Sequence, residues 1–305
     1  ALHAALPASA ATRVLPDTAP RDVQLMTAGA AALVVDNYRL DLAALLDRLD
    51  GRVPVVHFDD LDRNLAGVAI AVNGSPAAES RPDATGKTGT EILAGPKYQI
   101  LRDDLAPRPK SAAATPARLL MTYGGSDLLG IGPDLFGFAA DHLARRWPGL
   151  TIDFVVGALA EPPAGDRPAN LRVHHAPDDM PRLMCEADIA LSGGGQTMFE
   201  LARCGVPTAV LILGDDQTAN VDAMEKRGCI LKAGHANRPG WLDVLSETLN
   251  ILLTDGSVRQ QLYLAVRELF DGRGAERIAE AIRRVLERHA DASPAAGFGP
   301  ESITC

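Results

Sequence analysis

The sequence lacks several features that would each place it in a definite class. Aromatic residues make up only 4% of its 305 residues, and its four cysteines form no C-x-x-C pair. The absence of a C-x-x-C pair argues against a zinc-finger type of site, and we expect reduced thiols in a cytoplasmic protein. No apolar run approaches the roughly 20 residues that a membrane span needs. We expect no signal peptide, because no basic segment followed by an apolar one opens the chain.

An excess of positive charge is also lacking, since the net charge is −9. This disfavours non-specific binding to nucleic acid and to an anionic membrane surface, although a local phosphate site remains compatible with it. Hydrophobic residues make up 47% of the chain, which is ordinary for a globular protein. The length suffices for two domains, each with its own core.

Residues 1–106 have the pattern of one α/β domain. Apolar runs predict buried strands over 31–36, 53–59 and 68–72, with a helix over 40–49 between the first two. Carboxylates end two of these strands, Asp36 in the first and Asp59 with Asp60 in the second. Strands that alternate with helices predict a parallel, doubly wound sheet. Residues 107–117 carry three prolines and are expected to be a linker.

Residues 118–289 predict a second α/β domain with its own parallel sheet. The expected strands cover 119–123, 152–156, 171–174, 187–191, 208–213 and 229–231, and the expected helices cover 133–146, 180–186, 196–204, 217–227, 241–253, 258–270 and 275–289. We expect the last helix to be free to cross back to the first domain. The tail over 290–305 is rich in Ala, Pro and Gly, and we expect it to be mobile.

One stretch of this second domain, 187–204, organises the rest. A short apolar run leads into Gly193, Gly194 and Gly195, and helical spacing then begins at Gln196. Unpaired N–H groups and the dipole at the start of such a helix favour a phosphate group. Glu200 lies about one turn into the helix, where it can accept a hydrogen bond from a sugar hydroxyl. The alternative is a tight turn whose glycines only permit packing.

Further glycine and polar signals follow other strands of the second domain. The segment Gly124-Gly125-Ser126 follows one strand, and Gln217 and Asn220 follow another. Ligands of open parallel sheets bind at these carboxyl ends. The alternatives are a plain turn for the glycines, and amides that contact only water. Adjacent His174 and His175 point to opposite faces of a strand, so we expect no shared metal ion there.

Taken together, these motifs resemble a known family. The segment Ser192 to Thr197, Glu200, Gly205-Val206-Pro207, Gln217 and Asn220 are similar to the nucleotide-binding half of the UDP-sugar hydrolases of pseudaminic acid biosynthesis. These hydrolases are relatives of the spore-coat polysaccharide proteins and of the GT-B glycosyltransferase that makes lipid II. Asp36-Asn37-Tyr38, Asp59-Asp60 and the segment from Gly95 to Arg102 resemble the other half of that family. The resemblance covers roughly 33–234.

The resemblance implies a GT-B-like fold, with two Rossmann-like domains whose parallel sheets face a cleft. It also implies a role for individual residues. Uracil would lie near Ala176, Pro177 and Met180, and the ribose would meet Glu200. The diphosphate would meet the glycine turn and helix start at Gly194, Gly195, Gln196 and Thr197, with Gln217, Asn220 and the first glycine loop, Gly124, Gly125 and Ser126, nearby. The sugar would lie near Asp36, Tyr38, Asp60 and Tyr98. No metal or other cofactor is expected, because the helix start and the amides can carry the diphosphate charge.

Three departures from the family pattern affect catalysis and the nucleotide. The family's glycine-rich loop with a catalytic histidine, G-x-G-H-x-x-R, has no match, so we expect that the first strand–helix unit of the first domain is missing from a chain that begins at Ala1. Gln196 stands where the family usually has Ser, and Pro177 has no N–H to offer uracil. His57 and Asp59 are the remaining candidates for a general base. The alternative for His57 is a buried strand residue.

The expected activity is hydrolysis of a UDP-linked acetamido-deoxy sugar at its anomeric carbon, with release of UDP, in surface-polysaccharide or nonulosonic acid biosynthesis. Two alternatives stay open: a GT-B glycosyltransferase that uses the same donor site, and a non-catalytic protein that binds a nucleotide sugar. The sequence leaves the sugar and the oligomeric state undetermined.

Overall fold

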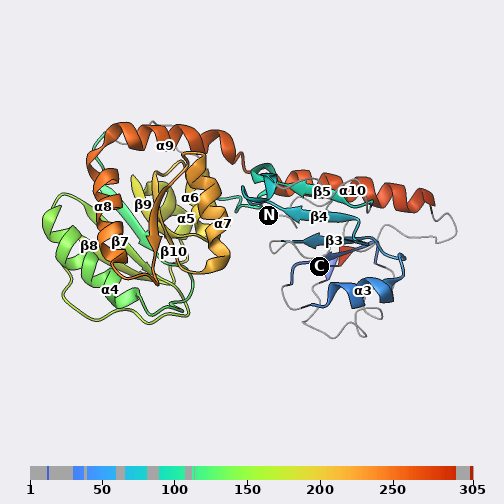
Figure 1. The fold of residues 1–305 in the computed structure, drawn as a ribbon, viewed down its shortest axis with the longest axis horizontal. Helices are drawn as coiled ribbons and strands as arrows, with labels where there is room; N and C mark the ends of the chain where they lie inside the picture. Colours follow the sequence, from blue (N-terminus) through green and yellow to red (C-terminus); the bar gives the residue numbers. More distant parts are fainter. Residues whose placement is uncertain are drawn as a thin grey trace. The chain divides into compact units, whose positions relative to one another are not determined.

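The computed structural model describes residues 12–13, 30–37, 40–59, 66–80, 89–106, 112, 114–292 and 303–304. The chain divides into two compact units (Figure 1). The first unit combines Ala1–Ile100 with Gly272–Cys305, and the second is Leu101–Asp271. Each unit has its own six-stranded sheet, and all strand pairs are parallel. The prediction of two Rossmann-like α/β domains with parallel sheets is therefore confirmed.

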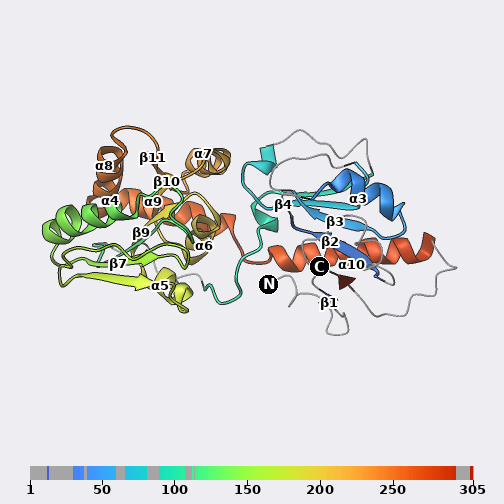
Figure 2. The same ribbon diagram turned by 90° about the horizontal axis from the view of Figure 1, so that it is seen from below.

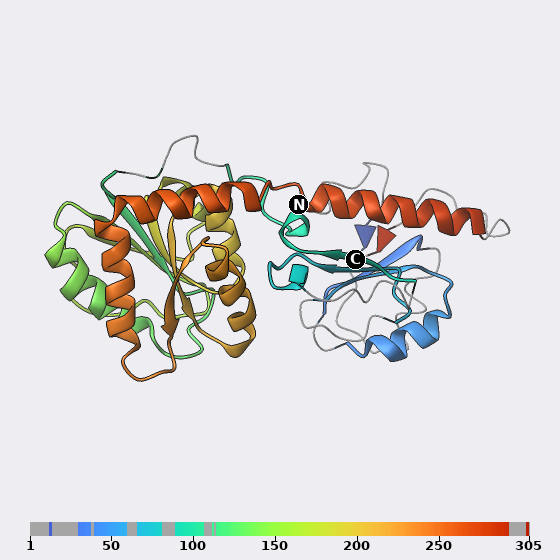
Figure 3. The same cartoon turned by 45° about the horizontal axis from the view of Figure 1, so that its top comes forward.

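In the first unit the strand order is β1-β12-β2-β3-β4-β5. The strands are β1 (Thr12–Arg13), β2 (Ala32–Val35), β3 (Val55–Phe58), β4 (Ile70–Asn73), β5 (Glu91–Ala94) and β12 (Ile303–Thr304), and the short helices are η1 (Ala78–Ser80) and η2 (Pro96–Tyr98). Two longer helices, α3 (Leu42–Leu49) and α10 (Gly274–Ala292), lie on opposite faces of this sheet (Figure 3).

The period-2 alternation along these strands explains why both faces carry a helix. Val34 and Val56 pack in a cluster with α10, whereas Leu33, Val35 and Val55 pack in a cluster with α3. Successive side chains of a strand point to opposite faces, so strands that are apolar at every position need cover on both sides. The continuous apolar runs of the sequence thus become strands buried between two helices.

In the second unit the strand order is β11-β10-β9-β6-β7-β8. The strands are β6 (Arg118–Thr122), β7 (Thr151–Val156), β8 (Leu171–His175), β9 (Ile189–Gly193), β10 (Thr208–Ile212) and β11 (Leu231–His235). The helices are α4 (Gly132–Gly137), which continues as the π-helix η3 (Phe138–Ala144), α5 (Met180–Glu186), α6 (Gln196–Cys204), η4 (Asp215–Gln217), α7 (Thr218–Lys226), α8 (Trp241–Thr254) and α9 (Gly256–Leu269).

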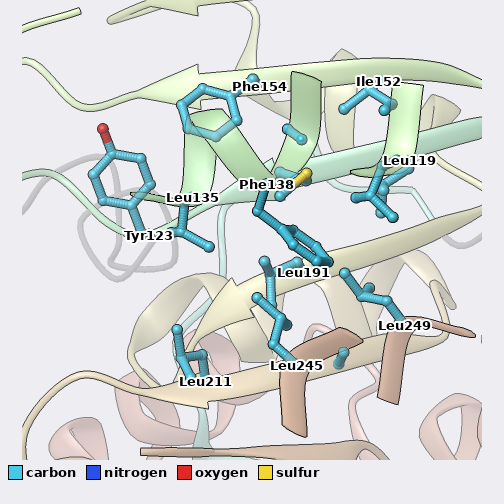
Figure 4. Close-up of a cluster of buried hydrophobic side chains, with 14 of the residues drawn as sticks. Leu119, Tyr123, Leu135, Phe138, Ile152, Phe154, Leu191, Leu211, Leu245 and Leu249 are labelled. Atoms are coloured by element: carbon cyan, nitrogen blue, oxygen red, sulfur yellow. The ribbon is translucent and has the colours of Figure 1, made fainter. Parts of the chain in front are cut away.

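The helices of the second unit cover both faces of its sheet. Side chains of α4, η3 and α8 pack on one face, where Leu135 and Phe138 meet Leu191 and Leu249 (Figure 4). Side chains of α5, α6, α7 and α9 pack on the other. Figure 2 shows α4 and α8 on one side of the strands and α5 on the other. This sandwich holds the carboxyl ends of the strands in a fixed arrangement.

Several elements differ from the sequence-based expectation. The helix expected over 275–289 was counted with the second domain, although it was also expected to be free to cross back to the first. α10 does cross back, since it packs its apolar face on the first sheet and belongs to the first unit. The division falls at Leu101 and Gly272 rather than within 107–117. Strand β5 was not predicted, and the strand expected over 229–231 lies at Leu231–His235 because Cys229 and Ile230 pack in a helix-side cluster before it begins.

Two other expectations concern regions with little or no description. Much of the expected linker and most of the expected tail lie outside the described residues, and α10 extends to Ala292, inside the range expected as tail. In the described part of the chain, no helix is both long and apolar enough to cross a membrane.

Candidate functional site

The second sheet reverses its strand order between β6 and β9, which are neighbours in the sheet. From β6 the chain proceeds outward through β7 and β8, and from β9 it proceeds outward in the other direction through β10 and β11. Such a switch point opens a crevice at the carboxyl ends of the strands. A pocket of about 410 Å³ lies there. It is lined by Tyr123, Gly124, Gly125, Ser126, Asp127, Leu128, Leu129, Ile131, Gly193, Gly195, Gln196, Thr197, Leu213, Gly214, Asp216 and Gln217.

The three glycines of the turn that precedes α6 differ in the space around them. A Cβ added at Gly193 would lie 2.8 Å from a Leu213 carbon, and one at Gly194 would lie 2.6 Å from a Val221 carbon. A Cβ at Gly195 would meet nothing within 4 Å. Gly195 is also exposed, and it is the N-cap of α6 without a side chain to cap the helix. The first two glycines therefore permit packing, and the third leaves space for a ligand at the helix start.

Gln217 ties the glycine turn to the end of β10. Its Oε1 accepts hydrogen bonds from the backbone N–H of Gly194 and of Leu213, both at 3.0 Å. Because both partners are donors, the amide oxygen is the atom that faces them, and Nε2 is left as the donor. The N–H of Gly194, expected to meet the diphosphate, is thus already bound to Gln217.

Asp127 follows the first glycine loop and fixes the turn that leads into α4. The carboxylate of Asp127 accepts hydrogen bonds from the backbone N–H of Ile131 at 2.8 Å and of Gly132 at 2.7 Å. Gly124 has a φ of +98°, which favours glycine, and added Cβ atoms at Gly124 and Gly125 would meet nothing within 4 Å. The expected loop therefore presents bare backbone to the pocket.

The structure adds residues that the sequence patterns did not single out. Leu128 and Leu129 form the tip of the turn that Asp127 holds, and they line the pocket while 91% and 44% exposed. Gly157, after β7, lies so close to this loop that a Cβ would be 2.4 Å from the carbonyl oxygens of Gly124 and Gly125. The only sequence signal that could have pointed to Gly157 is its position after a strand. No sequence signal marks Leu128 and Leu129 as residues of a pocket.

The pocket carries no positive side chain among its lining residues, since none of the described residues that line it is Lys, Arg or His. Asp127 and Asp216 are its charged members. An anion bound here would therefore depend on backbone N–H groups, the helix dipole and the Gln217 amide.

Glu200 lies one turn into α6 and does not line this pocket. It is partly buried, and no hydrogen bond joins it to the described residues. Burial raises the pKa of Glu200, the nearby Arg102 guanidinium opposes the rise, and Asp104 adds to it. Arg102 is itself bonded to Asp104 by two hydrogen bonds of 3.1 and 3.0 Å. Among the described residues, the Glu200 carboxylate therefore has no hydrogen-bond donor.

The residues expected near uracil form the turn between β8 and α5. Ala176 has a φ of +45°, which is unusual for a residue other than glycine, and its N–H donates to Val156 at 2.9 Å. Met180 begins α5 and packs in part against the core. Ala176, Pro177 and Met180 do not line the pocket.

Two polar residues near these elements have contrasting surroundings. Asn220 on α7 has a buried Oδ1 that accepts no hydrogen bond from the described residues. His174 is held by Asp153 at 2.8 Å, and Asp153 is held by Arg118 at 3.3 Å. No group of three or more metal-ligating side chains occurs in the described part of the chain.

In the first unit the candidate bases are buried. His57 is 0% exposed on β3, and Asp59 is 3% exposed just after it. Asp36 is exposed, and Tyr98 packs beside the α10 cluster, with the Lys97 ammonium 5.0 Å from its ring centre. Tyr38 and Asp60 lie outside the described residues.

Comparison with known proteins agrees with this architecture. No protein-family model matches the chain. The spore coat polysaccharide biosynthesis protein SpsG of Bacillus subtilis is 26% identical over 213 residues, which cover 65% of this chain. The match spans 60% of the length of SpsG.

Solved structures resemble this chain over residues of both units. A putative UDP-N-acetylglucosamine 2-epimerase from Listeria monocytogenes has a TM-score of 0.61 at 14% identity and covers 93% of this chain and 80% of its own. MurG of Acinetobacter baumannii has a TM-score of 0.58 at 15% identity, with 87% and 76% covered. The fold is GT-B-like. The spinosyn rhamnosyltransferase SpnG, solved with thymidine diphosphate, has a TM-score of 0.56 at 18% identity, with 88% and 76% covered. These identities show likeness of fold alone.

Proposed function

We propose that the second unit binds the nucleoside diphosphate of a nucleotide sugar, with UDP as the nucleotide. The observation that carries this proposal is the pocket at the switch point, where exposed glycine backbone at Gly125 and Gly195 meets the uncapped start of α6. The Glu200 carboxylate, which accepts no hydrogen bond from the described residues, supports a contact with the ribose hydroxyls. The similarity to SpsG, named for spore coat polysaccharide biosynthesis, supports the same class of ligand.

We propose further that the reaction is hydrolysis of a UDP-linked acetamido-deoxy sugar, in the cytoplasm and in the service of surface-polysaccharide or nonulosonic acid synthesis. The roles of Ala176, Pro177 and Met180 toward uracil, and of Asp36, Tyr38, Asp60 and Tyr98 toward the sugar, belong to this proposal. Attack on the anomeric carbon needs a base to activate water, and His57 and Asp59 are the candidates in this chain.

One observation favours a glycosyltransferase as the alternative. Leu128 and Leu129 place exposed apolar side chains on a wall of the pocket. Water as the attacking group needs no such wall, whereas an acceptor with an apolar part would contact it. Release of UDP from the donor alone supports a hydrolase, and release only after addition of an acceptor supports a transferase.

Binding is tested by calorimetric titration of the 305-residue chain with UDP, UMP, uridine and thymidine diphosphate. We expect Gly195→Val to abolish UDP binding, because its side chain would occupy the open space at the helix start. Gly149→Val is the matched control, since an added Cβ at Gly149 also meets nothing within 4 Å but lies away from the pocket. Equal UDP affinity in wild type and Gly195→Val would refute the site.

Catalysis is tested by incubating the chain with UDP-linked acetamido sugars and measuring free UDP. We expect binding with very slow turnover, because loss of a positioned base costs about 10²–10⁴-fold in rate. Rapid release that His57→Ala abolishes would identify His57 as the base. Rapid release that survives His57→Ala would implicate Asp59 or another residue.

A further inference from the structure

Two thiols face each other between α5 and α6, at the end of α6 away from the glycine turn. Cys185 lies near the end of α5, and Cys204 is the last residue of α6. Their sulfur atoms are 3.2 Å apart. The two helices pack on the same face of the second sheet, so their mutual position is set by the core beneath them. A disulfide bond of about 2.05 Å requires only a small approach of these sulfurs.

The two thiols differ in access. Cys204 is 0% exposed, whereas Cys185 is partly exposed and its sulfur also contacts the carbonyl oxygen of Ala106 at 3.6 Å. Cys229 is buried elsewhere in the same unit, and its sulfur contacts the Arg227 carbonyl at 3.8 Å. Cys185 is therefore the thiol that a reagent from solvent reaches first, with Cys204 directly behind it.

We propose that Cys185 and Cys204 form a reversible disulfide by exchange with a low-molecular-weight disulfide such as oxidised glutathione. In the first step the Cys185 thiolate attacks one sulfur of the reagent, forms a mixed disulfide and expels one thiolate. In the second step Cys204 loses its proton and attacks the Cys185 sulfur, which expels the second thiol. The reagent is reduced to two thiols, and the two cysteines are oxidised to one disulfide.

The electrostatics of the pair favour this order of steps. Burial raises the pKa of Cys204 most, and the hydrogen bond and the negative charge of Cys185 raise it further. A thiol with so high a pKa is a poor first nucleophile. Formation of the mixed disulfide removes the negative charge of the Cys185 thiolate. That charge then no longer opposes ionisation of Cys204, and the second step becomes easier.

The disulfide would cross-link the part of the fold that carries the candidate site. The segment 186–203 between the two cysteines contains β9, the glycine turn and Glu200. Closing a loop of this length restricts the unfolded chain, and we expect the midpoint of thermal unfolding to rise by about 5–10 °C. This inference does not rest on the proposed function, because no ligand enters it.

The test treats the native chain with oxidised glutathione, blocks the remaining thiols with N-ethylmaleimide and maps peptides without reduction. We expect a peptide that joins Cys185 to Cys204, the loss of two hydrogens from the intact mass, and reversal by dithiothreitol. Cys185→Ser should form no cross-link. Cys204→Ala, which keeps a small apolar group in the core, should instead keep a stable glutathione adduct on Cys185.

Cys229→Ser and Cys305→Ser are the controls, and both should cross-link as the wild type does. A stable glutathione adduct on wild-type Cys185 without the cross-link would overturn the proposal. So would a Cys185 thiol that stays unmodified in the native chain while the urea-unfolded chain reacts.

Discussion

The two sheets of this protein end in opposite ways at their carboxyl edges. In the described part of the first unit, a buried polar side chain occupies this edge: Asn73 donates to the Asp59 carbonyl at 2.9 Å and accepts from the Ser75 N–H at 3.0 Å. In the second unit the edge is bare glycine backbone around a pocket of about 410 Å³. Glycine alone does not make an edge open, because Gly74 and Gly95 follow β4 and β5 of the first unit, where an added Cβ would lie 2.6 Å from Gln99 and 3.1 Å from Glu79. The difference therefore depends on what packs against the glycines.

The largest expected effect concerns the amides that hold each edge together. Gln217→Leu leaves the N–H groups of Gly194 and Leu213 without their partner, and each such loss costs about 1–3 kcal/mol. We therefore expect a loss of about 2–6 kcal/mol in the unfolding free energy of the second unit, with loss of UDP binding. Hydrogen exchange followed by mass spectrometry reports each unit separately.

Asn73→Leu is the matched change in the first unit. Asn73→Leu should lower the protection of the first unit against hydrogen exchange by a free energy similar to that lost by the second unit in Gln217→Leu. It should leave UDP binding in the second unit unchanged. Equal UDP affinity in Gln217→Leu and wild type would show that the open edge does not need this amide.

The next effect separates the packing glycine from the open one. Gly194→Ala places a Cβ 2.6 Å from Val221, so we expect a destabilisation of about 1–3 kcal/mol from overpacking. Gly195→Ala meets no atom within 4 Å and should leave unfolding in urea nearly unchanged. A destabilisation of both variants by the same amount would contradict the division of roles within the turn.

A smaller effect is expected at Glu200 and depends on pH. Glu200→Ala should weaken UDP binding by about 1–3 kcal/mol, the usual loss for a charged hydrogen-bond partner. Burial raises the pKa of Glu200, so UDP affinity should fall with decreasing pH sooner than an ordinary glutamate would predict. Arg102→Gln removes the opposing charge and should move the fall to higher pH, whereas Asp104→Asn should move it to lower pH.

The same raised pKa makes a prediction about stability. An acid whose pKa is higher in the folded state stabilises the fold less as the pH rises above its unfolded value. Glu200→Gln should therefore raise the melting temperature near neutral pH while it weakens UDP binding. A melting temperature that falls together with UDP affinity would show that Glu200 has a structural role instead.

The smallest effect concerns salt. The lining of the pocket has no cationic side chain among the described residues, and the net charge of the chain is −9. Screening then has no attractive ion pair to weaken, so UDP affinity should change less than about threefold between low and physiological ionic strength. A steep loss of affinity with salt, measured by titration, would reveal a cation that this pocket does not contain.

Much of the fold was predictable because its signals are local. Continuous apolar runs predicted strands such as β2 and β6, and helical spacing between Gln196 and Gly205 predicted α6 with its end. Strand β5 was not predicted, because Glu91-Ile92-Leu93-Ala94 is a short run that mixes a charged residue with apolar ones. The sheet that α10 packs on was not predictable, because an amphipathic pattern shows that one helix face must be buried but not against which sheet.

The sequence by itself determined that glycines would end the strands of the second sheet, since only glycine tolerates the φ of +98° at Gly124 or the closeness of Val221 to Gly194. Only the tertiary structure decided which of those glycines is open. That choice depends on Leu213 just after β10, on Gln217 in η4 and on Val221 in α7, which lie about 20 residues or more along the chain. Contacts between segments so far apart form when the sheet assembles, and no local pattern contains them.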